Sequence, residues 1–132
     1  MKRMPLIAVL ALGLVLVLSA CGRSSVTLNV LATDTGYDSK VYTVPAGASV
    51  TLHLTNNGST EHEFAILKLG QQVSLPFSDD DEGKIYWELD GVAAGETKTD
   101  TFTAPTEPGE YSVVCGLPGH IEQGMTATLV VK

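Results

Sequence analysis

The sequence predicts one all-β domain, a Greek-key β-sandwich or barrel of about seven to eight strands. Short runs alternate between apolar and polar residues, and Gly- and Pro-rich turns separate them. Valine and threonine, which favour pleated structure, are abundant beyond the N-terminal segment. No stretch beyond residue 25 has a helical period of useful length. The domain is therefore expected to span residues 26–132.

The first four expected strands lie at residues 26–31, 40–44, 49–55 and 62–67. The first alternates Val and Leu with Thr and Asn, and a Pro-Ala-Gly turn ends the second. In the third, valine and leucine face one side, and threonine and His53 face the other. This parity places His53 at the surface and not in a binding site. An Asn-Asn-Gly-Ser turn precedes the fourth, whose alternation points His62 inward.

The remaining strands are expected at residues 84–89, 97–103, 111–115 and 125–131. The first of these contains the only Trp, which is expected to serve in packing, and the second has a polar Thr face. A Pro- and Gly-containing turn leads into the third, where Cys115 shares its face with apolar side chains. The last strand carries alternating apolar residues.

Between these halves, residues 78–83 form an acidic segment, Ser-Asp-Asp-Asp-Glu-Gly. We expect a solvated loop from Asp79 to Glu82. A docking patch for a basic partner or a calcium site are the alternatives, although the spacing and Gly placement differ from an EF-hand loop. The sequence leaves the role of this loop open.

The N-terminus has the composition of an export signal. Lys2 and Arg3 precede an apolar run over residues 6–18, which is shorter than the ~20 residues of a membrane-spanning helix. The Leu-Ser-Ala-Cys sequence that ends at Cys21 resembles a bacterial lipobox, and this implies cleavage before Cys21 and attachment of diacylglycerol to its thiol. We expect a signal peptide at residues 1–20 and a lipidated Cys with a short linker at 21–25. The alternative is a plain signal peptide with an incidental Cys. Either way the domain is exported, and the lipobox places it on a membrane, facing the periplasm or the extracellular side.

Charge and cysteine count exclude several classes of protein. The chain has 132 residues, 8 basic and 15 acidic side chains, and a net charge of -7, which argues against nucleic acid as a partner. Two Cys cannot make a disulfide-dense scaffold. If Cys21 is lipidated, Cys115 has no partner within the chain. A lone thiol in an oxidising compartment needs a use or protection.

The segment from Cys115 to Met125 carries the chemistry, as Cys-x4-His-x4-Met with Pro-Gly before His120. Strand parity turns the Cys and Met side chains toward the apolar face, and the loop between them can bring His120 to the same point. His62 faces inward on another strand. Two imidazoles, one thiolate and one thioether are the donor set of a blue-copper site, with two His and one Cys in a plane and a weak axial Met. All positions are taken by protein, which favours an electron carrier over a catalyst.

This segment resembles the ligand loop of the plastocyanin/azurin-type cupredoxins, and its form is most similar to the auracyanin and rusticyanin versions. Resemblance extends to the Val-Pro-Ala-Gly segment at 44–47 and the Pro-Gly-Glu-Tyr segment at 108–111. It implies a cupredoxin fold and one type 1 copper ion. The equatorial ligands would be His62, Cys115 and His120, with Met125 as the axial ligand.

The same resemblance implies single-electron transfer between redox proteins, with the exposed edge of His120 as the electron port and a docking surface around Leu117 and Pro118. One residue departs from the family pattern. Plastocyanin and azurin have Asn after the upstream His, where this chain has Glu63. A carboxylate lacks the amide donor that helps lock the Cys loop in those proteins, although the backbone N–H of Glu63 could reach the thiolate.

Three functional interpretations remain beside a membrane-tethered electron carrier. A copper-binding or copper-delivery protein without electron transfer could use the same four ligands. An enzyme such as a copper nitrite reductase or a multicopper oxidase is the next alternative. An oxidase would need additional His-x-His pairs, whereas this chain has three His in total, and Met125 argues against a mononuclear reactive site with an open position. A sandwich without metal would leave the ligand set unexplained. The redox partners, the reduction potential, the kind of electron-transport chain and the oligomeric state do not follow from the sequence.

Overall fold

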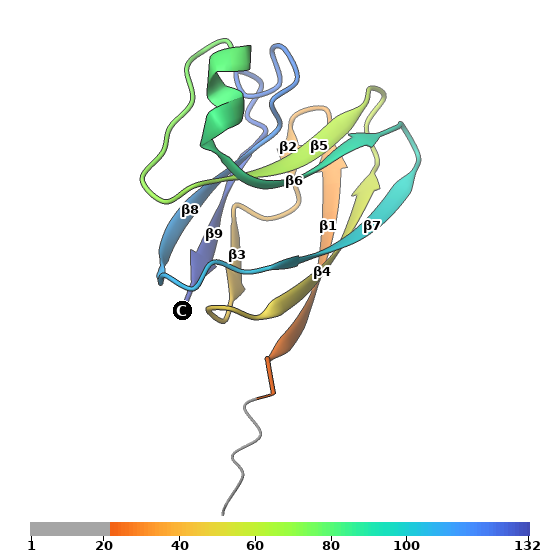
Figure 1. The fold of residues 1–132 in the computed structure, drawn as a ribbon. Helices are drawn as coiled ribbons and strands as arrows, with labels where there is room; N and C mark the ends of the chain where they lie inside the picture. Colours follow the sequence, from red (N-terminus) through yellow and green to blue (C-terminus); the bar gives the residue numbers. More distant parts are fainter. Residues whose placement is uncertain (1–21) are drawn as a thin grey trace, which may run out of the picture.

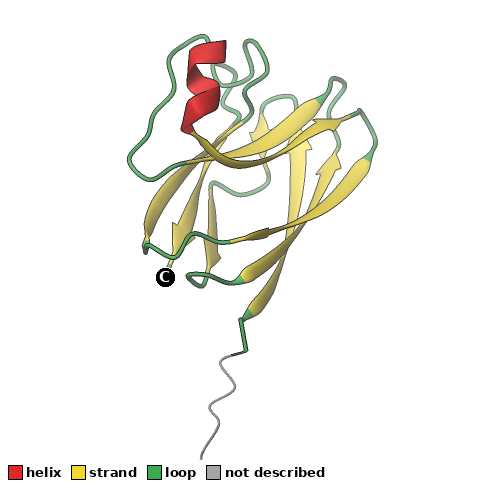
Figure 2. Ribbon diagram, in the orientation of Figure 1, coloured by secondary structure: helices red, strands yellow, loops and turns green. Residues whose placement is uncertain are grey.

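A computed structural model of the chain describes residues 22–132. The expected signal peptide and Cys21 lie outside the described residues. Two β-sheets pack face to face, and the only helix of the described part is one short 3₁₀ helix at one end of the sandwich (Figures 1 and 2). Over residues 22–132, no helix has the length and apolarity needed to cross a membrane.

Residues 22–132 form nine strands in two sheets. The four-stranded sheet has the order β2-β1-β4-β7, made of β1 (Ser25–Thr33), β2 (Gly36–Tyr37), β4 (Ser49–Asn56) and β7 (Thr97–Thr103). The five-stranded sheet has the order β3-β9-β8-β5-β6, made of β3 (Val41–Val44), β5 (His62–Leu67), β6 (Ile85–Val92), β8 (Gly109–Val114) and β9 (Thr126–Val131). Strands β1 and β4 pair in parallel, as do β3 and β9, and the other pairs are antiparallel. The predicted β-sandwich is confirmed, and the two-residue strand β2 is an addition to it.

Strand β4 shows how the sequence pattern becomes a core. Val50, Leu52 and Leu54 are fully buried between the sheets. On the opposite face, the Nδ1 atom of His53 lies 2.7 Å from the Thr99 hydroxyl of β7. The alternation of the sequence therefore places His53 at the outer surface, as predicted.

Aromatic side chains fill the centre of the sandwich. Phe64 of β5 forms T-shaped pairs with Tyr37 and Tyr42, with centroid distances of 5.3 and 5.8 Å. Trp87 stacks on Phe102 at 4.4 Å, which confirms its expected packing role. Such pairs add about 0.5–1.5 kcal/mol each beyond simple burial.

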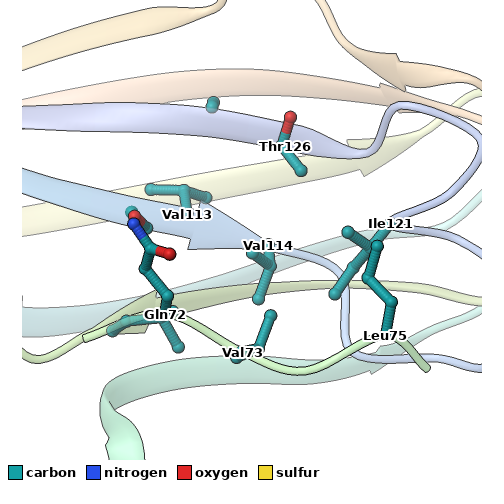
Figure 3. Close-up of a pocket in the computed structure, with 10 residues that line it drawn as sticks. Gln72, Val73, Leu75, Val113, Val114, Ile121 and Thr126 are labelled. Carbon is teal, nitrogen blue, oxygen red and sulfur yellow. The ribbon is translucent and has the colours of Figure 1, made fainter. Parts of the chain in front are cut away.

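The outer face of the five-stranded sheet is covered, which the sequence did not predict. Strand β5 buries both faces, because Ala65 and Leu67 pack with Val114 under the segment that connects β5 to β6. A hollow of about 260 Å³ remains there. Figure 3 shows Val73 and Leu75 of this segment among its lining residues. The connecting segment is thus a cover for the sheet and part of the fold.

Within this segment, the prediction of a solvated acidic loop holds for Asp79, Asp80 and Glu82, which are exposed, and fails at Asp81. Residues Asp79–Lys84 form the 3₁₀ helix η1, and the Asp81 side chain is fully buried. Its carboxylate accepts hydrogen bonds from the Ser78 backbone N–H at 3.0 Å and from the Lys84 ammonium at 2.7 Å, and the Ser74 hydroxyl lies at 3.4 Å. The Ser78 hydroxyl also donates to this carboxylate, and Lys84 forms an ion pair with it. Several donors thus share one acceptor, so Asp81 holds the loop together from within.

The two ends of the sandwich differ in what they carry (Figure 1). Strand β1 begins at one end, where the described chain starts, and the C-terminus lies at the same end. The loop that joins β8 to β9 lies at the opposite end, beside η1. This loop contains the candidate ligands.

We predict that Asp81→Ala releases the cover segment without unfolding the sandwich. Backbone amides of residues 72–84 should exchange with solvent roughly tenfold faster, because the loop donors lose their shared acceptor, while amides of β4 keep their protection. Hydrogen bonds from Lys84 and from the Ser78 backbone hold the pKa of the Asp81 carboxyl well below its usual range. The protection should therefore be complete above about pH 4 and fall as the pH drops further. Asp80→Ala, at an exposed neighbour, is the control. Equal exchange in both variants would contradict the role of Asp81.

Candidate metal centre

Three potential metal ligands converge at the end of the sandwich where β5 begins and β8 ends. The ligand atoms of His62, Cys115 and His120 all lie within 4.8 Å of one another. The two imidazole Nδ1 atoms are 3.2 Å apart, and the Cys115 Sγ lies 3.3 Å from Nδ1 of His120. Each histidine therefore turns the same ring atom toward a common point.

Backbone hydrogen bonds close the loop that brings these side chains together. The N–H of Cys115 donates to the Met125 carbonyl at 3.1 Å, and the N–H of Met125 donates to the His120 carbonyl at 3.0 Å. Gly119, with φ of +82°, provides a left-handed backbone conformation just before His120. The loop thus folds back on itself and returns the chain to β9 beside its starting point.

The candidate ligands differ in how deeply they are buried. His62, Cys115 and Met125 are fully buried, and the His120 side chain is half-buried at the molecular surface. Met125 belongs to the same core cluster as Cys115, next to the loop closure. The structure thus brings His62, Cys115 and His120 together as predicted, and the role of Met125 as fourth ligand stays a prediction.

Burial favours the uncharged forms of Cys115 and His120. Burial raises the pKa of the Cys115 thiol to about 11, although backbone N–H groups of Leu117 and Glu63 lower it. Burial and the neighbouring His62 lower the pKa of His120. The Cys115 thiol therefore tends to keep its proton, and the His120 imidazole tends to lose the proton of its charged form. A metal cation bound among these atoms would displace the thiol proton. A thiolate with two imidazoles fits copper by the softness of its donors.

The carboxylate of Glu63 locks the Cys loop from the outside. It accepts a hydrogen bond from the N–H of Gly116, the residue after Cys115. The Tyr37 hydroxyl fixes the same residue by donating to the Glu63 carbonyl at 2.6 Å. Burial raises the pKa of the Glu63 carboxyl. From the sequence we expected that residue 63 would lack the donor that helps lock the loop. The structure shows that the Glu63 carboxylate locks the loop as an acceptor instead.

Asp34, in the turn between β1 and β2, is a site residue that sequence reasoning missed. Its Oδ1 atom lies 3.1 Å from Nε2 of His62. The Ser59 hydroxyl and N–H also bond to this carboxylate, and they hold the pKa of Asp34 well below its usual range. A Cβ at Gly58 would collide with both Asp34 and His62, so the glycine permits their close approach. No local pattern in the sequence could reveal a contact between residues 28 positions apart.

Lys40 is a second residue that the sequence did not indicate. Its ammonium donates to the carbonyls of Gly124 and Thr126, at 2.8 and 3.1 Å. These carbonyls flank Met125, so Lys40 fixes the exit of the ligand loop to the start of β3.

A β-sandwich with a buried His-Cys-His cluster and a nearby Met defines a blue copper protein of the cupredoxin type. The chain belongs to the sulfocyanin family, because the profile of the Sulfocyanin (SoxE) domain matches residues 9–132. The family binds one copper ion, and the three clustered side chains form the site that fits it.

Two curated relatives match most of this chain and a smaller share of their own length. Sulfocyanin of Sulfolobus acidocaldarius is 28% identical over 107 residues, which cover 74% of this chain and 53% of the relative. The copper-resistant cuproprotein CopI of Rubrivivax gelatinosus is 31% identical over 115 residues, which cover 80% of this chain and 66% of the relative. The chain thus spans between about half and two thirds of these relatives.

Solved structures share the whole domain. Reduced auracyanin of Roseiflexus castenholzii superposes with a TM-score of 0.70 at 26% identity, covering 84% of this chain and 99% of that one. Reduced rusticyanin superposes with a TM-score of 0.56 at 27% identity, covering 80% of this chain and 79% of that one. The resemblance to auracyanin and rusticyanin is confirmed. A multicopper oxidase at 19% identity shares the fold alone.

We predict that Glu63→Ala destabilises the domain more than Glu63→Gln does. Alanine leaves the Gly116 N–H without its acceptor, which costs about 1 kcal/mol or more, whereas glutamine keeps an oxygen at that place. The Tm of Glu63→Ala should be lower than that of the wild-type chain by roughly 4 °C or more. Equal losses of Tm in the two variants would show that the hydrogen bond is not what Glu63 contributes.

Proposed function

We propose that this chain is an exported, membrane-tethered type 1 copper protein that carries single electrons between redox partners. His62, Cys115 and His120 would hold the copper ion, with Met125 as its weak axial ligand. The proposal rests chiefly on one observation, the convergence of two imidazoles and one thiol within 4.8 Å at the end of a rigid sandwich.

The protein would supply the copper ion with a rigid set of donor atoms. When bound, copper would supply a one-electron Cu(II)/Cu(I) couple. The buried His62 and Cys115 exclude water from the inner side of the site. Strand pairing and the loop closure at Met125 fix the donor positions before any metal arrives. A fixed donor set suits electron transfer, because the site is reorganised little between oxidation states.

His120 is the proposed port for electrons. It is the one half-buried member of the cluster, and Leu117 and Pro118 of the same loop lie at or near the surface. An apolar surface around this imidazole would let a redox partner approach closely. The net charge of -7 favours partners that are neutral or basic.

The proposed tether fits the orientation of the domain. Strand β1 starts at the end of the sandwich opposite the ligand loop (Figure 1). A lipid on Cys21, followed by the short linker at 22–25, would attach that end to a membrane and turn His120 away from it. The site would then face the periplasm or the extracellular side, where soluble partners can reach it.

A copper-handling role is the second candidate, and the 31% identity with CopI favours it. Both roles use the same ligands, but a delivery protein must release its ion. A buried, pre-arranged donor set holds copper rather than passing it on. An enzymatic role is disfavoured, because protein ligands would fill every position at the metal.

The visible spectrum of the copper-loaded chain tests the proposal. We expect an intense thiolate-to-copper band that disappears on reduction and returns on oxidation without loss of metal. Cys115→Ser should abolish the band, because the thiolate is its source. A pale complex would rule out type 1 copper, and release of copper on reduction would favour the delivery role.

We predict that Met125→Leu keeps the band and raises the reduction potential. Leucine conserves the buried volume but removes a weak donor that favours Cu(II) over Cu(I). A tenfold weaker binding of Cu(II) alone corresponds to a rise of about 59 mV, which voltammetry resolves. An unchanged potential would mean that Met125 does not coordinate the ion.

A further inference from the structure

We propose that Asp34 is a positioning residue for the copper site: it fixes the proton of His62 on Nε2 and biases the site toward the oxidised metal. This inference rests on the proposed role of His62 as a ligand. It concerns a carboxylate outside the ligand loop, contributed by the turn between β1 and β2.

The two ring nitrogens of His62 have separate tasks. Nδ1 faces the cluster, 3.2 Å from Nδ1 of His120, and Nε2 lies 3.1 Å from Oδ1 of Asp34. An ionised carboxylate can only accept hydrogen bonds, so the proton of this contact belongs to Nε2. Nδ1 is then left with a free lone pair that points at the metal position. The contact selects the binding-competent tautomer before a metal is present.

Asp34 is itself held in place. The N–H of Ser59 donates to both carboxylate oxygens, at 2.8 and 3.0 Å, and the Ser59 hydroxyl donates to Oδ2 at 2.7 Å. Thr60 adds longer contacts of 3.4 Å from its N–H and hydroxyl. These donors hold the carboxylate in place and aim it at His62, although its side chain is 41% exposed. Gly58 leaves the room that this arrangement needs.

A charge at this place acts on the metal through the imidazole. A carboxylate that accepts the distal N–H makes the ring a stronger donor. The negative charge also stabilises the doubly charged Cu(II) more than Cu(I). Asp34 should therefore lower the reduction potential and strengthen Cu(II) binding, beyond its effect on the fold.

Asp34→Asn is the decisive variant, because the amide oxygen can still accept the His62 N–H while the charge is lost. We expect Cu(II) affinity to fall 10–100-fold, with a smaller loss for Cu(I). Each tenfold difference between the two losses raises the potential by about 59 mV. Glu61→Gln is the matched control, since Glu61 is an exposed carboxylate next to His62 that makes no hydrogen bond to it in the described part of the chain. Ser59→Ala controls for loosening of the turn, since it removes one donor to Asp34 and leaves the charge.

A potential rise in Asp34→Asn that exceeds both controls supports the proposal, and a potential equal to theirs overturns it. The tautomer of His62 in the metal-free wild-type chain, measured from ¹⁵N chemical shifts, is an independent readout that needs no variant to fold. A proton on Nε2 is expected, and a proton on Nδ1 overturns the proposal. If the wild-type chain showed no intense visible band, the proposed function would fail instead, while the tautomer would still report on Asp34.

Discussion

The site depends on the closure of one loop over the end of the β-sandwich. Two backbone hydrogen bonds, from Cys115 to Met125 and from Met125 to His120, return the chain to β9 beside the point where it left β8. Because both strands are paired in the same sheet, the loop ends cannot separate without breaking the ladder. His62 enters from β5 on the other side of β8, so sheet order alone brings the third donor within reach.

Two carboxylates support this arrangement. Asp34 accepts the outer N–H of His62, and Glu63 accepts the N–H of Gly116 beside Cys115. Each carboxylate accepts a hydrogen bond from a group whose position the site depends on. The Glu63 carboxylate also lies close to the buried Cys115 thiol, where its charge raises the cost of a thiolate without a cation. A bound cation relieves that repulsion. The carboxylate therefore disfavours a free thiolate in the empty site and favours a metal-bound one.

The rest of the molecule protects and orients this end. The segment between β5 and β6 covers the outer face of the five-stranded sheet, and Asp81 holds it together from within. Phe77 of this segment lies close to Gly116, so the cover reaches the Cys loop as well as the sheet. The opposite end of the sandwich carries the start of the described chain (Figure 1). The fold thus separates the end that is available for attachment from the end that carries the ligands.

The sequence by itself determined the strand pattern, the inward face of β4 and the identity of the four candidate ligands. It could do so because alternation is a local signal, and because Cys115, His120 and Met125 lie within one short loop. Only the tertiary structure revealed Asp34 beside His62 and the burial of Asp81. Asp34 lies in a turn and Asp81 in a short 3₁₀ helix, where no periodicity marks which face is buried. Asp34 is positioned by contacts with distant residues, and Asp81 by donors from its own folded segment. A carboxylate in such a segment has the same local signature whether it is solvated or holds a site together.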